Sequence, residues 1–215
     1  MDRTPWRGLR LAVPFALAVA AFGLAFGALA RTAGLSPLMV FVMSATTFAG
    51  SAQFAAISVL RDGSAAAAIV AAILLNGRYL PMGIASSSAI RGAWWKRLLA
   101  AQLVVDESWA IGHRGDGTFD PRRLLGAGAL VYVAWVLSST IGAVGGAFLG
   151  DPRALGLDGA FPALFLALLW PQIRGRRAAL AAALGAAIAI VTSTFAPPGV
   201  PIIAATLACL VAVWP

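Results

Sequence analysis

Long runs without charged residues alternate with short polar stretches along the chain. A helix needs about 20 apolar residues to cross about 30 Å of hydrocarbon. Uncharged runs near that length occupy residues 11–30, 32–60, 124–150, 159–173, 178–196 and 199–215, the last two being parted by Pro197-Pro198-Gly199. A further run, 63–90, is interrupted only by Arg78, and 95–112 is shorter and carries Asp106 and Glu107. These runs lack the alternation that strands of a membrane barrel require. The pattern predicts an all-α integral membrane protein, a polytopic helical bundle of six to eight membrane segments forming one transmembrane domain over residues 1–215.

Composition supports a membrane protein and argues against nucleic-acid binding and metal sites. The chain is 60% hydrophobic and 11% charged, whereas a soluble domain is about 45–50% apolar and about 25% charged. The formal net charge is +8, but the basic residues are spread between the apolar runs and form no single patch for nucleic acid. The chain has one cysteine, Cys209, and one histidine, His113, too few soft ligands for a typical zinc or haem site. We therefore predict neither a metal nor a cofactor.

The basic clusters predict the orientation. Arg3, Arg7 and Arg10 precede the first run, which we interpret as a membrane helix and not a signal peptide, with the N-terminus in the cytoplasm. Three further groups are expected inside: Arg91/Lys96/Arg97, Arg114/Arg122/Arg123 and Arg174/Arg176/Arg177. Arg31 and the Asp151/Arg153/Asp158 loop are expected outside.

Two topologies satisfy these charges differently. If every run crosses the membrane, the Arg91/Lys96/Arg97 loop lies outside. If 32–60 and 95–112 both dip into the membrane and return, six spans remain and all three groups lie inside. Trp94-Trp95, next to Lys96, mark a membrane–water interface. The small-residue pairs Gly23/Gly27 and Gly142/Gly146 predict close helix–helix approach.

Charged residues at membrane depth are the main functional signal. A charge at the bilayer centre costs about 2.5 kcal/mol or more, and Arg78 lies near the middle of its run, two residues after Asn76. Gly77 and Pro81 weaken the helix there. The natural partners of Arg78 are Asp106 and Glu107. Gln102 is four residues before Asp106 and is expected on the same helix face.

The most distinctive segment is Phe48-Ala49-Gly50-Ser51-Ala52-Gln53-Phe54-Ala55, preceded by Thr46 and Thr47. The Gly50-Ser51 pair favours a helix break, after which the restarting helix would present free N–H groups and its positive end to a carboxylate. The same small residues are also typical of a tight helix–helix contact, and spacing alone leaves both interpretations open.

These segments resemble the AzlC family, the large subunit of bacterial two-component AzlC/AzlD branched-chain amino-acid exporters. The resemblance rests on the octapeptide, the Asn76-x-Arg78 segment, the Asp106-Glu107 pair, Gly156-Leu157-Asp158, and Phe161-Pro162-Ala163-Leu164-Phe165. It departs at Tyr79, where the family commonly has His, and at Ser108-Trp109, where Thr-Phe is expected. A weak internal repeat is also visible in Gly34-Leu35-Ser36-Pro37 and Gly156-Leu157-Asp158-Gly159.

The resemblance implies a non-enzymatic permease of the bacterial inner membrane. It is expected to move valine, leucine and isoleucine, with methionine as a further candidate, out of the cytoplasm by alternating access. The resemblance also implies a small hydrophobic AzlD-type membrane subunit as partner. The expected substrate-binding residues are Thr47, Gly50, Ser51, Gln53, Asn76 and Arg78. Asp106 and Glu107 are expected to form an ion pair or to couple transport to an ion.

Two other functions remain open from the sequence. An intramembrane hydrolase could use Ser51, but His113 adjoins the hydrophilic stretch 114–120 and is expected in solvent, and Lys96 lies beside the tryptophans. A passive pore or scaffold subunit would use the same polar groups to line water or join helices.

Overall fold

A computed structural model describes residues 6–62, 65–145, 166, 169–170, 173, 175–196, 200–208 and 210–211. Helices make up the regular structure of this described part, as the apolar runs predict. The chain divides into two compact units. The first contains Met1–Gly50 and Arg78–Pro162, the second Ser51–Gly77 and Ala163–Pro215, and each unit is described by itself.

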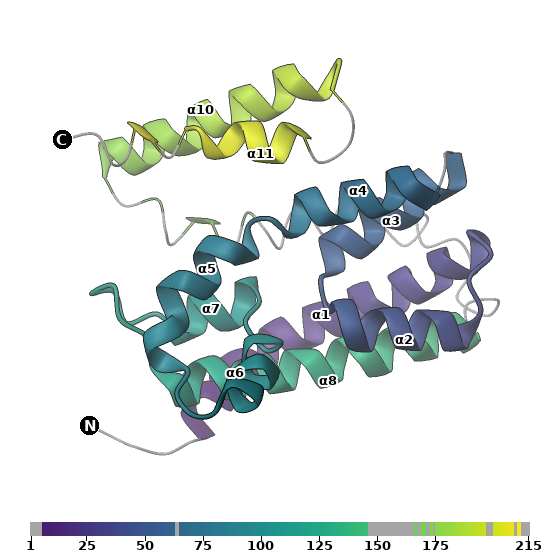
Figure 1. The fold of residues 1–215 in the computed structure, drawn as a ribbon, viewed down its shortest axis with the longest axis horizontal. Coiled ribbons are helices and arrows are strands. Elements are labelled where there is room, and N and C mark those ends of the chain that lie inside the picture. The colour runs from purple at the N-terminus through teal and green to yellow at the C-terminus, as the bar shows by residue number, and fades with distance from the viewer. Residues whose placement is uncertain are drawn as a thin grey trace. The chain divides into compact units, whose positions relative to one another are not determined.

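The first unit is built around two long helices (Figure 1). Its helices are α1 (Trp6–Thr32), α2 (Pro37–Thr47), α5 (Tyr79–Ser86), α6 (Trp94–Ala101), α7 (Asp106–Gly112) and α8 (Pro121–Gly145), with the 3-10 turn η1 (Ser87–Ala89) after α5. α1 and α8 pack along most of their lengths. α2 and α7 also pack against α8, so α8 is the element that joins this unit.

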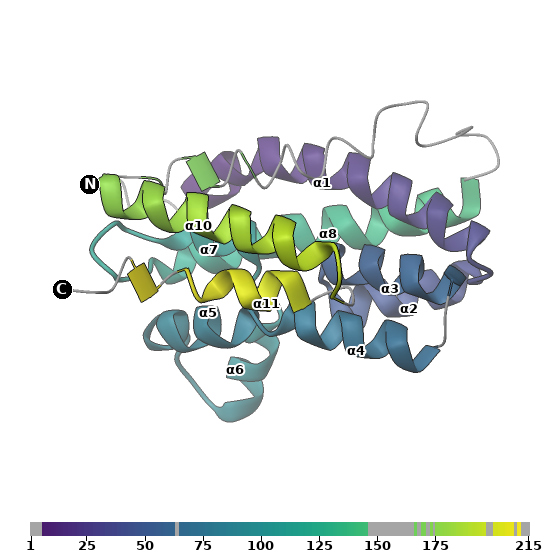
Figure 2. The ribbon, with the colours of Figure 1, turned by 90° about the horizontal axis from the view of Figure 1, so that it is seen from above.

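Glycines allow α1 and α8 to approach backbone to backbone. A Cβ at Gly23 would collide with Ser138, one at Gly27 with the backbone of Ser139, and one at Gly142 with the backbone of Leu24. This confirms the close approach expected from three of the four small residues; Gly146 lies outside the described residues. Early residues of α1 meet early residues of α8 and late ones meet late ones, so the two helices run parallel (Figure 2).

α2 runs antiparallel to α8 and ends near its middle. The Ser139 hydroxyl donates to the Ser44 hydroxyl (2.9 Å), and both side chains are fully buried. The Tyr132 hydroxyl, closer to the start of α8, donates to the Ala45 carbonyl (2.9 Å). α2 has 11 residues, about 16 Å of helix, which is too short to cross a bilayer alone.

Several connections gather at the N-terminal end of α8. Ile90, Val104, Phe119 and Leu124 form one apolar cluster there. The segments before α6 and after α7 therefore meet at the same end of the unit.

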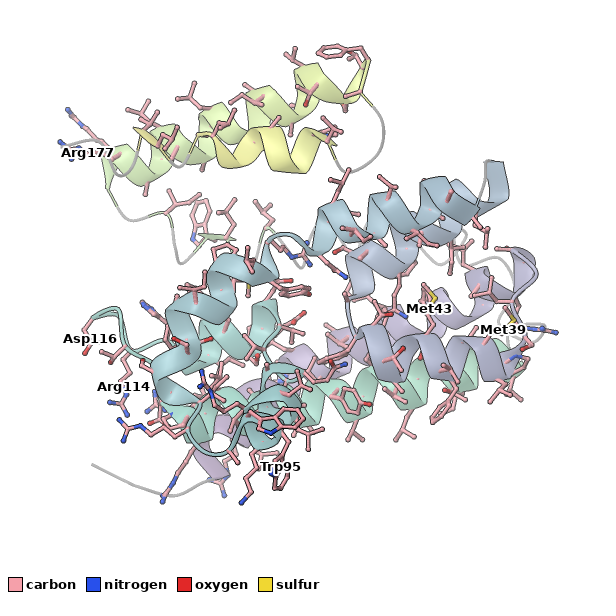
Figure 3. The ribbon with its side chains drawn as sticks, in the orientation of Figure 1. Met39, Met43, Trp95, Arg114, Asp116 and Arg177 are labelled. Carbon is pink, nitrogen blue, oxygen red and sulfur yellow. The ribbon has the colours of Figure 1, made fainter. Side chains whose placement is uncertain are left out.

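Carboxylates hold the loop between α7 and α8, in which Figure 3 labels Arg114 and Asp116. The Asp120 side chain accepts from the N–H groups of Arg122 (3.0 Å) and Arg123 (3.2 Å) and so caps α8. The hydroxyl and N–H of Thr118 donate to Asp116 and hold the pKa of that carboxyl below its ordinary value.

The second unit contains α3 (Gly50–Asp62), α4 (Ala65–Asn76), α10 (Arg176–Ser193) and α11 (Val200–Thr206), Gly50 itself belonging to the first unit. α11 packs against both α10 and α4. Gly185 lies where an added Cβ would be 3.5 Å from the Ala205 carbonyl oxygen, so a small residue again permits close packing.

Four apolar stretches are long enough to cross a membrane: Leu9–Thr32, Ala68–Ala89, Pro121–Gly145 and Arg176–Ser193. They correspond to four of the predicted runs. The runs at 32–60 and 95–112 are each divided into two short helices, and the run at 159–173 lies almost wholly outside the described residues. The chain is therefore an all-helical membrane protein with several candidate spans.

Candidate functional site

The helix break expected in the octapeptide is present. α2 ends at Thr47, and Phe48 adopts the left-handed conformation (φ 40°, ψ 54°) that stops a helix. α3 begins at Gly50. The chain is thus interrupted at Phe48-Ala49, directly before the Gly50-Ser51 pair.

Side chains from two other elements cover the exposed carbonyls at the end of α2. The Gln102 amide donates to the Thr46 carbonyl (2.9 Å) and more distantly to the Ala45 carbonyl (3.4 Å). Tyr132 also donates to Ala45, and its ring contacts that of Phe48 edge-on, with centroids 4.9 Å apart. Because helix-end carbonyls lack partners within the helix, and lipid supplies none, these donors stabilise a helix end that lies within a long apolar run.

A second break interrupts the segment Ala68–Ala89. α4 ends at Asn76, where the Gly77 N–H donates to the carbonyls of Ile73 (3.0 Å) and Leu74 (3.2 Å), and α5 begins at Tyr79. Pro81 lies in the first turn of α5, where proline leaves no helical hydrogen bond unmade. The expected weakness at Gly77 and Pro81 therefore appears as a turn that ends at Arg78.

Arg78 forms an ion pair with Asp106. The distance from Nη2 of Arg78 to Oδ2 of Asp106 is 2.8 Å, and the side chains are only 20% and 22% exposed. The same guanidinium nitrogen lies 3.3 Å from the Tyr79 hydroxyl, and the guanidinium carbon is 5.0 Å from the centre of that ring. Two segments 28 residues apart thus bring opposite charges together inside the first unit.

The acidic pair begins a helix. Asp106 and Glu107 occupy the first turn of α7, where the positive end of the helix favours negative charge. The Ser108 hydroxyl accepts from the Val105 N–H (2.9 Å) and donates to the Leu103 carbonyl (2.7 Å), which fixes the entry into α7. Glu107 is half-buried, and it is Asp106 that contacts Arg78.

One expectation about this segment is wrong. Gln102 and Asp106 do not share a helix face, because α6 ends at Ala101 and α7 begins at Asp106. The turn at 102–105 separates the two side chains, and Gln102 instead reaches the end of α2.

The other predicted residues fall in both units. In the first unit, Thr47 is exposed at the end of α2 and Gly50 is half-buried. In the second unit, Ser51 is half-buried and Gln53 is completely buried, both in the first turn of α3. Asn76 ends α4, and its buried Oδ1 has no hydrogen-bond donor among the residues that the structure describes.

Sequence reasoning missed the polar residues of α8. Tyr132 and Ser139 contact the α2 segment that precedes the break, and neither was singled out. Both lie inside an otherwise apolar run with a serine and a threonine near Ser139, and polar residues at membrane depth were a usable signal.

His113 lies in a different environment from the one expected. It is half-buried, its ring stacks on Trp109 (centroids 5.4 Å apart) and meets Phe119 edge-on (5.2 Å), and its Nδ1 accepts from the Gly115 N–H (3.3 Å). The aromatic neighbours leave His113 half-buried, next to the exposed residues 114–118. Within the described ranges, no group of three or more His, Cys, Asp or Glu side chains could hold a metal ion.

Comparison with known proteins now identifies the family. The AzlC protein family matches residues 14–149, which include both helix breaks and the Arg78–Asp106 pair. The chain belongs to the AzlC family. An uncharacterized membrane protein of Archaeoglobus fulgidus is 34% identical over 206 residues, covering 94% of this chain and 90% of that protein.

Another AzlC relative has a functional name. The branched-chain amino acid transport protein AzlC of Bacillus subtilis is 26% identical over 175 residues, 78% of this chain and 68% of that protein. An uncharacterized membrane protein of Helicobacter pylori is 25% identical over 174 residues, covering 79% of this chain and 75% of its own length. No solved structure matches this chain.

Proposed function

We propose that this AzlC-family chain exports the branched-chain amino acids valine, leucine and isoleucine, and methionine as a further candidate, by alternating access together with a small AzlD-type membrane subunit. The observation that carries the proposal is the ion pair of Arg78 and Asp106 at a break in a membrane-length apolar segment. The family match and the name of the Bacillus subtilis relative support an amino-acid substrate.

The proposed site uses the broken helices. The N–H groups and the hydroxyl at Gly50-Ser51, where α3 begins, are the proposed contacts for the substrate carboxylate, as in transporters whose discontinuous helices direct their positive ends at anionic groups. Asn76 and Arg78, at the second break, are the alternative contacts for this carboxylate. Thr47 on α2 and Gln53 on α3 are further polar candidates for substrate binding. The aliphatic side chain lies among apolar residues, where each buried CH₂ contributes about 0.8 kcal/mol.

The acidic pair has a separate role. Asp106 holds Arg78 in its place, since a carboxylate 2.8 Å from the guanidinium offsets the unfavourable burial of both charges. Glu107 follows it on the first turn of α7 and is the candidate for the substrate ammonium or for a coupling proton. Neither role requires a metal or an organic cofactor.

The packing supports the six-span topology. Ile90, before α6, and Phe119, after α7, belong to one apolar cluster with Leu124. A segment whose two ends meet at the same end of α8 dips and returns. With the N-terminus in the cytoplasm, the parallel helices α1 and α8 then begin on the same side, and the basic groups at 91–97 and 114–123 are cytoplasmic together.

An efflux experiment tests the proposal. Cells fed a valine-containing dipeptide are followed for released valine while they make this chain, an AzlD-type subunit, both or neither. The proposal expects efflux only when both are present. Efflux with the small subunit alone would make this chain a scaffold and contradict the proposal, as would equal efflux in all four strains.

A further inference from the structure

The short helix α6 carries an apolar face that the described protein does not cover. Trp94 and Leu98 are four residues apart, as are Trp95 and Leu99, so the four side chains share one side of the helix. They are exposed to 77%, 64%, 49% and 65% in that order. Large apolar side chains exposed together mark a surface that contacts a membrane, a ligand or another protein.

Cations lie beside this apolar face. Lys96 and Arg97 project from the other side of α6, and Arg91 precedes the helix. All three are exposed, and the Lys96 ammonium is 5.1 Å from the centre of the Trp95 ring. No acidic residue occurs between Asp62 and Asp106, so this part of the chain is uniformly positive.

The chain geometry places α6 next to a membrane-length segment. Ala68–Ala89 ends five residues before Trp94. Gly92 has a φ of +120°, a conformation that glycine adopts readily and other residues do not, and it redirects the chain into α6. Figures 1 and 2 show α6 turned across the direction in which α1 and α8 run.

α6 is attached to the end of the unit where α8 begins. Ala100 packs against the apolar cluster that contains Ile90 and Leu124. That end also carries Arg122 and Arg123 in the first turn of α8. A helix that lies across the spanning helices, at their basic end, with tryptophans on its apolar side, has the features of an interfacial helix.

We infer that α6 lies in the plane of the cytoplasmic membrane surface and that Arg91, Lys96 and Arg97 bind the phosphate headgroups of anionic phospholipids while Trp94, Trp95, Leu98 and Leu99 enter the lipid. This assignment gives the α6 surface, formed by these seven residues, a role apart from amino-acid binding. Its side of the membrane rests on the six-span topology proposed above, but its preference for anionic lipid does not.

Lipid enrichment tests the headgroup contacts. The full chain is placed in nanodiscs containing equal amounts of phosphatidylglycerol and phosphatidylcholine, and lipids that remain bound after mild detergent extraction are counted by mass spectrometry. Each basic side chain near an anionic surface strengthens association about fivefold. The triple variant Arg91→Gln, Lys96→Gln, Arg97→Gln is expected to lose about fivefold or more of the phosphatidylglycerol enrichment.

The matched control keeps the charge. The variant Arg91→Lys, Lys96→Arg, Arg97→Lys is expected to retain the enrichment of the wild type. An unchanged enrichment in the neutral triple variant, or no enrichment in the wild type, overturns the inference.

A depth measurement stands independently of protein yield. In a Cys209→Ser background, a spin label at Leu98→Cys is expected to collide mainly with oxygen, which dissolves in lipid. A label at Lys96→Cys is expected to collide mainly with a water-soluble nickel chelate. If the chelate reaches both labels equally, α6 lies in water and the inference is wrong, whatever happens to valine efflux.

Discussion

The α1–α8 interface and the region around the helix breaks are stabilised in opposite ways, the first by small residues and the second by polar and charged side chains. At the interface, Gly23, Gly27 and Gly142 remove side chains so that two unbroken helices touch along their backbones. Around the breaks, short helices end within long apolar runs. The Gln102 amide there donates to a carbonyl at the end of α2, and Arg78 forms an ion pair with Asp106.

This difference indicates that the α1–α8 interface has a structural role and that the region around the helix breaks has a functional one. Small residues hold long helices together without any charge, so the α1–α8 interface needs no substrate to explain it. Arg78 and Asp106 would be unfavourable in lipid, so their presence in a membrane protein indicates a functional role. Continuous helices would not need Gln102 or Tyr132 to donate to carbonyls at their ends. We therefore expect substitutions in the two regions to affect different measurements.

The largest effect is expected at the ion pair. Asp106→Ala leaves the guanidinium of Arg78 without its carboxylate, and removing one partner of a buried pair destabilises by about 3–5 kcal/mol. Valine efflux should fall to the level of cells without the chain. Asp116→Ala, which removes an exposed loop carboxylate, is the matched control and should leave efflux unchanged; equal loss in both would refute the special role of Asp106.

The next effect is on stability alone. Gly142→Val places a side chain against the backbone of Leu24, and overpacking of this kind costs about 1–3 kcal/mol. The melting temperature in detergent should fall, whereas efflux per folded molecule should not. Gly145→Val, on the same helix with no described atom within 4 Å of its Cβ, should change neither quantity. A lower melting temperature in both variants would argue against the close contact.

A smaller effect is expected where α2 ends. Gln102→Leu removes the amide that covers the Thr46 and Ala45 carbonyls, whereas Tyr132→Phe removes one donor to Ala45. Hydrogen bonds between membrane helices contribute about 0.6 kcal/mol on average and up to about 1.7. The initial rate of valine efflux at equal protein abundance should fall more for Gln102→Leu than for Tyr132→Phe. Unchanged rates in both would mean that the position of this helix end does not matter for transport.

The smallest effect is expected for Ser139→Ala. It removes the hydroxyl that donates to Ser44 between α8 and α2, a loss of about 0.6 kcal/mol. Differential scanning fluorimetry should show a slight decrease in melting temperature, and efflux should stay the same. Complete loss of efflux would place the functional region nearer the α1–α8 interface than we propose.

Much of the fold could be predicted because lipid imposes a simple rule on sequence. Apolar length located the helices, and Gly50-Ser51 and Gly77 located two breaks, since each change in composition changes what a helix can do. The turn at 102–105 could not be predicted, because Gln102, Leu103 and Val104 are all compatible with a helix, and their turn depends on contacts with α2 and α8.

The candidate site, like the fold, could be predicted from the sequence only in part. Charge alone suggested that Arg78 needs Asp106 or Glu107, but only the fold shows that Asp106 contacts it. The contacts of His113 with Trp109 and Phe119 could not be predicted, because they depend on how the loop after α7 folds back.

The most direct test of the central claim compares two single substitutions for transport at equal membrane abundance. Gln53→Ala and Arg78→Ala are made alongside Arg31→Ala, whose guanidinium donates to the Leu35 carbonyl just after α1. Released valine is measured in cells that also contain the small subunit. The account predicts that efflux disappears in the first two variants and persists in the third, and full efflux in both Gln53→Ala and Arg78→Ala would contradict it.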